Sequence, residues 1–258
     1  MDFSIIINTH NQSKYLSECI KTCLNQNYLS YEVIVVDTSN RPSKNKFKNL
    51  KKLRYFHIKE KFKNFPVLNQ MYQIKFGLRK SKGKYICLLD GDDKFSNLKL
   101  VKISKMFSQS SIKIIQDIPI LFSKDFFEES KIKEYKKNVF FQKMFVSWPQ
   151  VFGTSSISCS REMLMEFFKK GKPFYFSSLA IDVKLMLYAY NNFFHINKFK
   201  GITLKRLHKK NLDKNFSNFI SRSFWLRRKM QIEYDYFLNG KVTFNLDYVL
   251  TKIINVIL

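Results

Sequence analysis

The stretch Lys84-Tyr85-Ile86-Cys87-Leu88-Leu89-Asp90-Gly91-Asp92-Asp93 decides the fold of this chain. Its apolar run, Tyr85 to Leu89, has the length of a buried strand and ends in three carboxylates and a glycine. In an open α/β sheet, this order places the acids at the carboxyl end of a strand, where ligands bind. The three carboxylates repel one another unless a divalent cation lies among them, and oxygen ligands beside a glycine suit Mg²⁺ or Mn²⁺ with substrate phosphates. A solvated Asp-Gly turn is the alternative that this stretch alone leaves open.

Two more apolar strands are predicted before this stretch, at 3–7 and 31–37. Between them, apolar residues recur at helical spacing up to Gln26: Tyr15, Leu16, Cys19, Ile20, Cys23 and Leu24. Strands without polar alternation, joined by a helix, are typical of a right-handed βαβ unit in a parallel sheet. A short strand at 53–58 and a helix at 66–80 then lead into the acidic stretch.

The remainder of the chain continues this alternation of strands and helices. Strands are predicted within 112–122, 152–160 and 196–207, and helices over 98–107, 161–170 and 179–190. The segment 128–137 is highly charged, which predicts a solvated insertion. Beyond it, the tail interleaves aromatic and basic residues and ends in an apolar stripe: Val249, Leu250, Ile253, Ile254, Ile257 and Leu258.

The composition predicts a folded protein with an anionic partner. A hydrophobic content of 45% excludes global disorder. The formal charge of +26 predicts a nucleotide, a nucleic acid or an acidic membrane surface as the partner. The four cysteines lack metal spacing and are expected to be buried thiols in a reducing compartment. Without a signal peptide or a long apolar run, the chain is expected to be cytoplasmic.

The order of the N-terminal segments resembles one known family. The segments that carry the likeness are Ser4–Asn11, Tyr15-Leu16, Leu24–Gln26, Tyr31–Asp37, Gly77-Leu78, Lys82–Ile86 and Leu89–Asp93. Together they resemble the family 2 glycosyltransferases of GT-A fold. The likeness continues more thinly through Ser158–Glu162, Asp182 and Lys205–His208.

The resemblance implies an α/β fold of GT-A type, with a Rossmann-like, mostly parallel sheet flanked by helices and a helical, basic C-terminal appendage. The glycosyltransferase domain is expected at 1–210, with a nucleotide-sugar-binding half at 1–95 and an acceptor half at 96–210. The tail at 211–258 is expected to be helical and is a candidate for contact with an anionic membrane.

By the same resemblance, a nucleoside diphosphate sugar lies across the carboxyl ends of the strands. The residues expected to bind it are Asn8, Thr9 and His10 at the base, Asp37 at the base or ribose, Asp90 at the ribose or at a metal-bound water, and Lys75 and Arg206 at the diphosphate. Asp92 is the first choice of ligand for Mn²⁺ or Mg²⁺, with Asp93 and His208 beside it. The metal would neutralise the charge that develops on the departing diphosphate.

Asp182 falls where the family carries its catalytic base. In that role it would take the proton from an acceptor hydroxyl as this attacks the anomeric carbon, and the single displacement would invert that carbon.

Each residue also has a simpler interpretation. Asp182 would favour the helix dipole at a helix start, and Asp37 would form an Asx turn. Thr9 and His10 would cap the first helix, and Lys75 and His208 would be ordinary solvated side chains.

The family suggests a glycan or lipid-linked glycan as the acceptor, in the synthesis of bacterial capsule, lipooligosaccharide or another surface glycan. Three rivals stay open. A nucleic-acid or anionic-surface binding protein would use the positive charge and ignore Asp92. A nucleotidylyltransferase would share the sheet, but no glycine-rich basic loop follows the first strand. A sugar-nucleotide sensor without activity would have Asp182 far from the metal.

Overall fold

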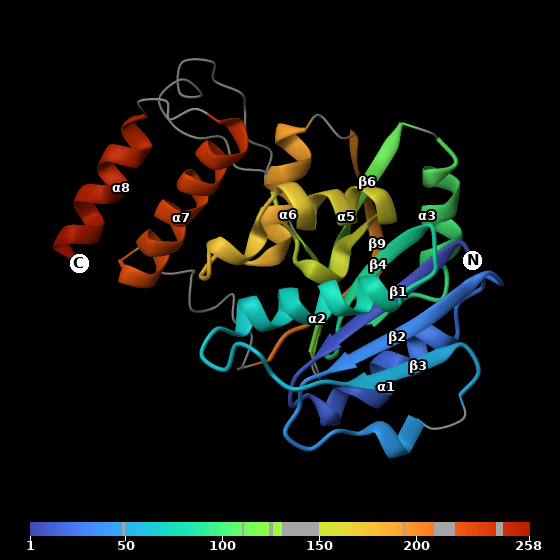
Figure 1. The fold of residues 1–258 in the computed structure, drawn as a ribbon. Helices are drawn as coiled ribbons and strands as arrows, with labels where there is room; N and C mark the ends of the chain where they lie inside the picture. The colour runs from blue at the N-terminus through green and yellow to red at the C-terminus, as the bar shows by residue number, and fades with distance from the viewer. Residues whose placement is uncertain are drawn as a thin grey trace.

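A computed structural model describes residues 1–47, 50–109, 111–123, 126–130, 150–192, 195–208, 220–240 and 245–258 (Figure 1). Within these ranges, the strands form one sheet in the order β3-β2-β1-β4-β8-β6-β9-β5, with β7 paired to β6. The strands are β1 (Phe3–Thr9), β2 (Tyr31–Asp37), β3 (Leu53–His57), β4 (Tyr85–Asp90), β5 (Lys94–Phe95), β6 (Ile112–Phe122), β7 (Phe127–Glu129), β8 (Ile157–Ser160) and β9 (His195–Arg206).

Strands β3, β2, β1 and β4 are parallel, and their register brings the expected site residues together. Asn8 lies opposite Asp90 of β4, and Thr9 lies opposite Asp37 of β2. Strand β8 pairs antiparallel with β4, and β6 and β9 run parallel to each other farther along the sheet. The parallel half therefore collects the ends of β1, β2 and β4 at one edge, while the other half of the sheet is mixed.

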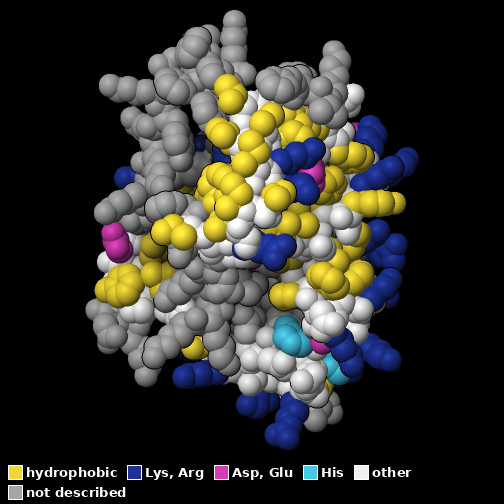
Figure 2. All heavy atoms as spheres, turned by 90° about the vertical axis from the view of Figure 1, so that its left-hand side faces the viewer, with side chains coloured by type: hydrophobic (Ala, Val, Ile, Leu, Met, Phe, Trp, Pro, Cys, Tyr) yellow, Lys and Arg dark blue, Asp and Glu magenta, His cyan; other side chains and the backbone are white. Residues whose placement is uncertain are grey.

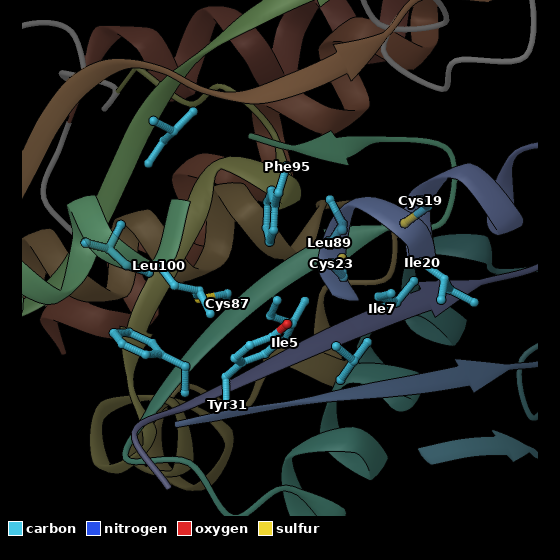
Figure 3. Packing of buried hydrophobic residues seen from close by; sticks show 14 of the residues in the cluster. Ile5, Ile7, Cys19, Ile20, Cys23, Tyr31, Cys87, Leu89, Phe95 and Leu100 are labelled. Atoms are coloured by element: carbon cyan, nitrogen blue, oxygen red, sulfur yellow. The ribbon is translucent and has the colours of Figure 1, made fainter. Parts of the chain in front are cut away.

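Helices cover both faces of the sheet (Figure 1). They are α1 (Ser13–Leu24), α2 (Pro66–Lys80), α3 (Lys99–Phe107), α5 (Arg161–Lys170), α6 (Ile181–Asn191), α7 (Arg222–Asn239) and α8 (Leu246–Ile257), with short 3₁₀ helices η1 (Lys44–Phe47), η2 (Thr154–Ser156) and η3 (Pro173–Tyr175). Because successive strand residues point to opposite faces, Ile5 and Ile7 pack with α1, and Ile6 packs with α2. Figure 3 shows the first of these clusters, in which Cys19, Cys23 and Cys87 are buried among aliphatic and aromatic side chains.

Most predicted elements are confirmed, with α2, α5 and β2 matching the expected ranges to the residue. The strand predicted within 152–160 is confirmed only for Ile157–Ser160, because the 3₁₀ helix η2 occupies Thr154–Ser156 before it. Segment 112–122 forms one strand, as does 195–206. The predicted insertion at 128–137 lies outside the described residues beyond Ser130.

The described part of the tail is helical, as expected, and α8 is oriented unusually. Its buried residues are polar, Asp247 and Thr251, and Asp247 forms an ion pair with Arg228 of α7. Its exposed hydrophobic residues are Leu246, Leu250, Ile253, Val256 and Ile257, and Lys252 is exposed among them. The apolar stripe of α8 therefore faces away from α7.

The four cysteines, Cys19, Cys23, Cys87 and Cys159, are buried and free, as expected. Among the described helices, none combines the length and hydropathy needed to cross a bilayer.

Candidate active site

The acidic loop after β4 is held tightly against the end of β1. The Gly91 amide donates to the carbonyl of Asn8 at 2.9 Å. A Cβ on Gly91 would lie 2.6 Å from Oγ1 of Thr9, so only glycine allows this approach. The Asp93 amide donates to the carbonyl of Asp90 at 3.0 Å, which closes the turn. The loop is therefore an ordered part of the sheet edge.

Asp93 is buried and anchors this loop to the other half of the sheet. Its Oδ2 accepts from Oγ of Ser155 at 2.6 Å, and its Oδ1 accepts from the Arg206 amide at 2.7 Å. Burial raises the pKa of Asp93 well above its usual range, and the charges of Asp92 and Asp90 raise it further. Both oxygens of Asp93 thus already have protein partners.

Asp92 pairs with His208, the histidine that follows β9. Nε2 of His208 lies 2.8 Å from Oδ2 of Asp92. The ring of Tyr15 stacks on the imidazole, with centroids 5.5 Å apart and planes 11° apart. A carboxylate and an imidazole, both ligand types for divalent metals, therefore lie side by side on a stacked support.

Arg206 joins the acidic loop to α1. Its Nε donates to the carbonyl of Asp92 at 2.9 Å, and its Nη2 forms an ion pair with Glu18 of α1. The guanidinium carbon lies 4.6 Å from the Tyr15 ring centroid and 4.5 Å from that of Phe122. These contacts attach Arg206 to the acidic loop and to the side chains that support it, so Arg206 acts here as a positioning residue.

Asp90 accepts two side-chain hydrogen bonds, from Nδ2 of Asn8 at 2.8 Å and from Nε2 of Gln70 at 2.7 Å. Burial raises the pKa of Asp90 to about 7, and the charges of Asp92 and Asp182 add to this shift. Oδ1 of Asn8 is buried without a hydrogen-bond partner within the described structure. These amides leave a polar lining at the carboxyl ends of β1 and β4.

The end of β2 carries a second polar network. The Asp37 carboxylate accepts from the Ser39 amide at 2.7 Å and from the Tyr55 hydroxyl. Burial and the neighbouring Asp37 raise the pKa of Tyr55. Nδ1 of His10 lies 3.0 Å from the carbonyl of Thr38, which gives His10 a defined place above the end of β2.

Side-chain amides from α2 complete this network. Nδ2 of Asn69 donates to Oγ1 of Thr38 at 2.9 Å, and Nε2 of Gln73 donates to the carbonyl of Thr9 at 2.6 Å. Oδ1 of Asn69 is buried without a partner within the described structure. Asn8, Thr9, His10 and Asp37 thus lie together, as expected.

Asp182 lies in the first turn of α6, and its Oδ1 accepts from the Val183 amide at 2.9 Å. It lines a cavity of about 280 Å³. Because its charge contributes to the raised pKa of Asp90, Asp182 lies within electrostatic range of the acidic loop.

Lys75 was expected at the site, but its side chain lies beside two phenylalanine rings away from the acidic loop. Its Nζ lies 5.4 Å from the ring centroid of Phe174 and 5.8 Å from that of Phe168. Gln70 and Gln73 of the same helix reach the site, and the 3.6-residue period places Lys75 on another side of α2. Lys75 therefore lies away from the position where it was expected to contact the diphosphate.

Sequence reasoning missed several residues that shape the site: Tyr15, Glu18, Gln70, Gln73 and Ser155. Tyr15 was expected in an apolar helix stripe and in a segment that carries the family resemblance, with no role at the site. The others are ordinary polar residues whose contacts come from distant strands. The polar side chains of Asn69, Gln70 and Gln73, close together on α2, are the local signal that could have indicated Gln70 and Gln73.

The residues fit a divalent cation through few protein ligands. Among the described residues, no three His, Cys, Asp or Glu side chains gather as a complete metal site. The side chains of Asp92 and His208 are nevertheless in contact and mostly buried. The carboxylate of Asp93 already accepts hydrogen bonds from Ser155 and Arg206. Hard cations commonly use one or two protein ligands together with substrate phosphates and waters. Asp92 and His208 therefore suit a cation whose other ligands are water and the oxygens of a diphosphate.

This fold and the acid-tipped strand at its centre define a domain of the GT-A glycosyltransferase class. The chain belongs to Glycosyl transferase family 2, whose family model matches residues 4–168.

Curated relatives agree with this assignment. An uncharacterized glycosyltransferase of Rickettsia bellii is 29% identical over 171 residues, which are 60% of this chain and 23% of that protein. An uncharacterized glycosyltransferase of Haemophilus influenzae is 34% identical over 103 residues, which are 38% of this chain and 39% of that protein. The chain thus matches less than half of the length of either relative.

Solved structures share the fold at low sequence identity. The S. aureus TarS fragment 1–349 in complex with UDP-GlcNAc has a TM-score of 0.64 and 15% identity, and the match covers 99% of this chain and 70% of that one. The mannosyltransferase PcManGT from Pyrobaculum calidifontis, in complex with GDP-Man and Mn²⁺, has a TM-score of 0.58 and 11% identity, with 97% and 68% covered.

Proposed function

We propose that this chain transfers a sugar from a nucleoside diphosphate sugar to an acceptor hydroxyl, with inversion and with a divalent cation. The observation that carries the proposal is the contact between Asp92 of the acidic loop and His208. In addition, the charge of Asp182 contributes to the raised pKa of Asp90 in the same loop. The site thus offers a place for a cation with a diphosphate and, within electrostatic range, a carboxylate for the acceptor. The complexes of TarS with UDP-GlcNAc and of PcManGT with GDP-Man and Mn²⁺ support this type of donor.

The donor lies across the carboxyl ends of β1, β2 and β4 in this proposal. Asn8, Thr9, His10 and Asp37 surround the base and ribose, and the unpartnered Oδ1 of Asn8 accepts a donor hydroxyl. Asp90 is held by Asn8 and Gln70 in an orientation that suits a ribose hydroxyl or a metal-bound water.

Asp92 and His208 hold Mn²⁺ or Mg²⁺ in this proposal, while Asp93 and Arg206 keep the loop in place. When bound, the cation offsets the negative charge that develops on the departing diphosphate. Asp182 takes the proton of the acceptor hydroxyl as that oxygen attacks the anomeric carbon. The attacking oxygen and the departing diphosphate lie on opposite sides of that carbon, so its configuration inverts.

Thermal unfolding with UDP-, GDP- and CDP-sugars, with and without Mn²⁺, tests this proposal. A donor at about 100 times its Kd stabilises by about 2.7 kcal/mol, which predicts a rise in Tm of about 5 to 10 °C. Asp92→Ala should lose the Mn²⁺-dependent part of the rise, and Asp182→Asn should keep it. Glu162→Gln, which removes an exposed acid of α5, is the matched control and should behave as wild type. If no donor raises Tm with any metal, the transferase proposal fails.

The acceptor in this proposal is a growing bacterial surface glycan, as in capsule or lipooligosaccharide synthesis, on a lipid carrier at the inner face of the cytoplasmic membrane. The support is the outward apolar stripe of α8, on which Leu250 is 42% and Ile253 50% exposed, together with the net charge of +26. Figure 2 shows the face on which α8 lies, with hydrophobic side chains over its middle and Lys and Arg side chains along one edge. An apolar stripe on a basic protein suits an anionic lipid surface.

Vesicle flotation tests the membrane contact. Vesicles with 30% anionic lipid should retain the protein, and Leu250→Glu/Ile253→Glu should release it. Lys21→Glu on α1 controls for the change of charge. Retention that persists in the double variant, or binding to DNA that matches binding to vesicles, would point instead to general attraction of polyanions.

A further inference from the structure

Gln70 of α2 joins the donor edge of the sheet to the segment beside the Asp182 cavity. Its Nε2 donates to Oδ1 of Asp90 at 2.7 Å and to Oγ1 of Thr154 at 3.3 Å. Asp90 ends β4 and begins the acidic loop, whereas Thr154 directly follows residues 151–153, which line the cavity. This side-chain amide therefore contacts structure on both sides of the proposed reaction.

The two hydrogen bonds fix which way the Gln70 amide faces. Oδ1 of Asp90 accepts from Nδ2 of Asn8 as well as from Gln70, so the NH₂ group of Gln70 is the end that faces the carboxylate. The carbonyl oxygen Oε1 is the other end of the same planar group. Within the described part of the chain, no residue donates a hydrogen bond to Oε1, and the Gln70 side chain is partly exposed. Oε1 is thus an acceptor that a ligand can use.

The other two amides of this cluster on α2 face a different part of the site. Asn69 donates to Oγ1 of Thr38, and Gln73 donates to the carbonyl of Thr9, beside the ends of β2 and β1. Both belong to the region proposed for the base and ribose. Gln70 is directed toward the end of β4 instead, so its carbonyl oxygen is available to another part of the donor.

We propose that Oε1 of Gln70 accepts a hydrogen bond from a hydroxyl of the transferred sugar. In the reaction proposed above, this sugar lies between the departing diphosphate at Asp92 and the acceptor hydroxyl at Asp182. The partners of Gln70 belong to the acidic loop and to the segment that follows the cavity lining, and Asp182 lies within electrostatic range of one of them, Asp90.

A carbonyl oxygen recognises only a group that can donate a hydrogen bond. Gln70 therefore favours a donor sugar with a hydroxyl at the position that faces Oε1 over a sugar that lacks this hydroxyl. This inference rests on the proposed function and adds a residue that recognises the transferred sugar.

A comparison of nucleotide sugars with bare nucleoside diphosphates tests the inference. The probes are UDP-glucose, UDP-galactose, UDP-GlcNAc and GDP-mannose, with UDP and GDP, and calorimetric titration in Mn²⁺ gives each Kd. In Gln70→Met, the Kd of the sugar nucleotide that wild type binds most tightly should rise at least about threefold relative to the Kd of its diphosphate. A loss that acts through Asp90 alone affects both ligands and cancels in this ratio. Lys75→Met introduces the same side chain elsewhere on α2 and should keep the wild-type ratio.

Mono-deoxy forms of the same sugar nucleotide identify the hydroxyl. In wild type, one deoxy form should bind at least about threefold more weakly than its parent, and in Gln70→Met this form and its parent should bind alike. Equal losses for each deoxy form in the two proteins would overturn the inference. So would a Gln70→Met variant that weakens the sugar nucleotide and its diphosphate by the same factor, because Gln70 would then only hold Asp90.

The Tm rise of wild type with donor and Mn²⁺ keeps this inference apart from the proposed function. A normal rise without coupling between Gln70 and any hydroxyl rejects recognition of the sugar by Gln70 and leaves the transferase proposal intact. A missing rise in wild type rejects the transferase proposal itself.

Discussion

Nε2 of His208 lies 2.8 Å from Oδ2 of Asp92, although 116 positions of sequence separate the two residues. The position of His208 is set by the end of β9. There, the Arg206 amide donates a hydrogen bond to Asp93, and its guanidinium donates one to the carbonyl of Asp92. The contact links the acidic loop after β4 to the residues that follow β9, the last strand in the sequence.

Removal of the imidazole should weaken metal use more than donor recognition. His208→Ala should raise the Mn²⁺ concentration for half-maximal donor stabilisation by at least about tenfold, because changes even to the surroundings of a metal site cost that much. His57→Ala, on β3 at the other end of the strand order, is the matched control and should leave the Mn²⁺ requirement unchanged. A variant with the wild-type Mn²⁺ requirement would exclude His208 as a ligand.

Tyr15 should act through its ring rather than its hydroxyl. The ring stacks on His208 and carries the Arg206 guanidinium. Tyr15→Phe should therefore keep the wild-type Mn²⁺ requirement, and Tyr15→Ala should raise it severalfold while the Kd for the donor at saturating Mn²⁺ stays within about twofold. If the phenylalanine and alanine variants behave alike, the stacking does not position His208.

Loss of the carboxylate at Asp182 should stop transfer and spare donor binding. Asp182→Asn should lower kcat by about 10² to 10⁴-fold, the usual contribution of a general base. The donor-induced rise in Tm should stay at the wild-type value. Activity is followed by release of the nucleoside diphosphate in the presence of acceptor, and a wild-type kcat would remove Asp182 from the mechanism.

The acidic loop should make the metal-free protein less stable as pH rises. The pKa of Asp90 is about 7 in the folded protein, mainly through burial, and about 4 in an unfolded chain. Between these values the folded state holds a proton that the unfolded state lacks, so this group's contribution to the free energy of unfolding falls from about pH 4 to about pH 7. The variant Asp90→Asn lacks this pH-dependent contribution to the free energy of unfolding.

Urea unfolding in EDTA at pH 4.5, 6 and 7.5 measures the effect. The free energy of unfolding of wild type relative to Asp90→Asn should fall across this series. Glu162→Gln, an exposed acid, should follow wild type at each pH. A constant difference between wild type and Asp90→Asn would contradict the raised pKa.

Removing one partner of the buried ion pair between Lys99 and Asp117 should destabilise the protein more than removing both partners. Lys99 and Asp117 are fully buried, and Nζ of Lys99 also donates to Oγ1 of Thr203 at 3.0 Å. Lys99→Met leaves Asp117 without its cation and should destabilise by about 3 to 5 kcal/mol. Lys99→Met/Asp117→Leu should recover most of this loss. Urea unfolding decides, and an equal loss in the double variant would mean that packing rather than charge dominates.

Local patterns were sufficient for the elements and for the ligand-binding edge. The apolar runs of β1, β2 and β4 and the helical spacing in α1 and α2 depend on neighbours within one or two turns, so they can be read from the chain directly. The position of Asp90, Asp92 and Asp93 after a buried strand likewise placed them at the sheet edge. Parallel pairing of strands of similar length then brought Asn8, Thr9 and Asp37 beside them.

What the sequence by itself determined was therefore the parallel half of the sheet and the acids at its edge. The tertiary structure alone decided which polar side chains meet those acids. Ser155 and Arg206 reach Asp93 from segments 62 and 113 positions away, and the face of α2 that packs on the sheet brings in Gln70 while Lys75 turns elsewhere. The physical reason is that such contacts depend on the register between distant strands and on the rotation of a helix about its axis, which no local spacing specifies.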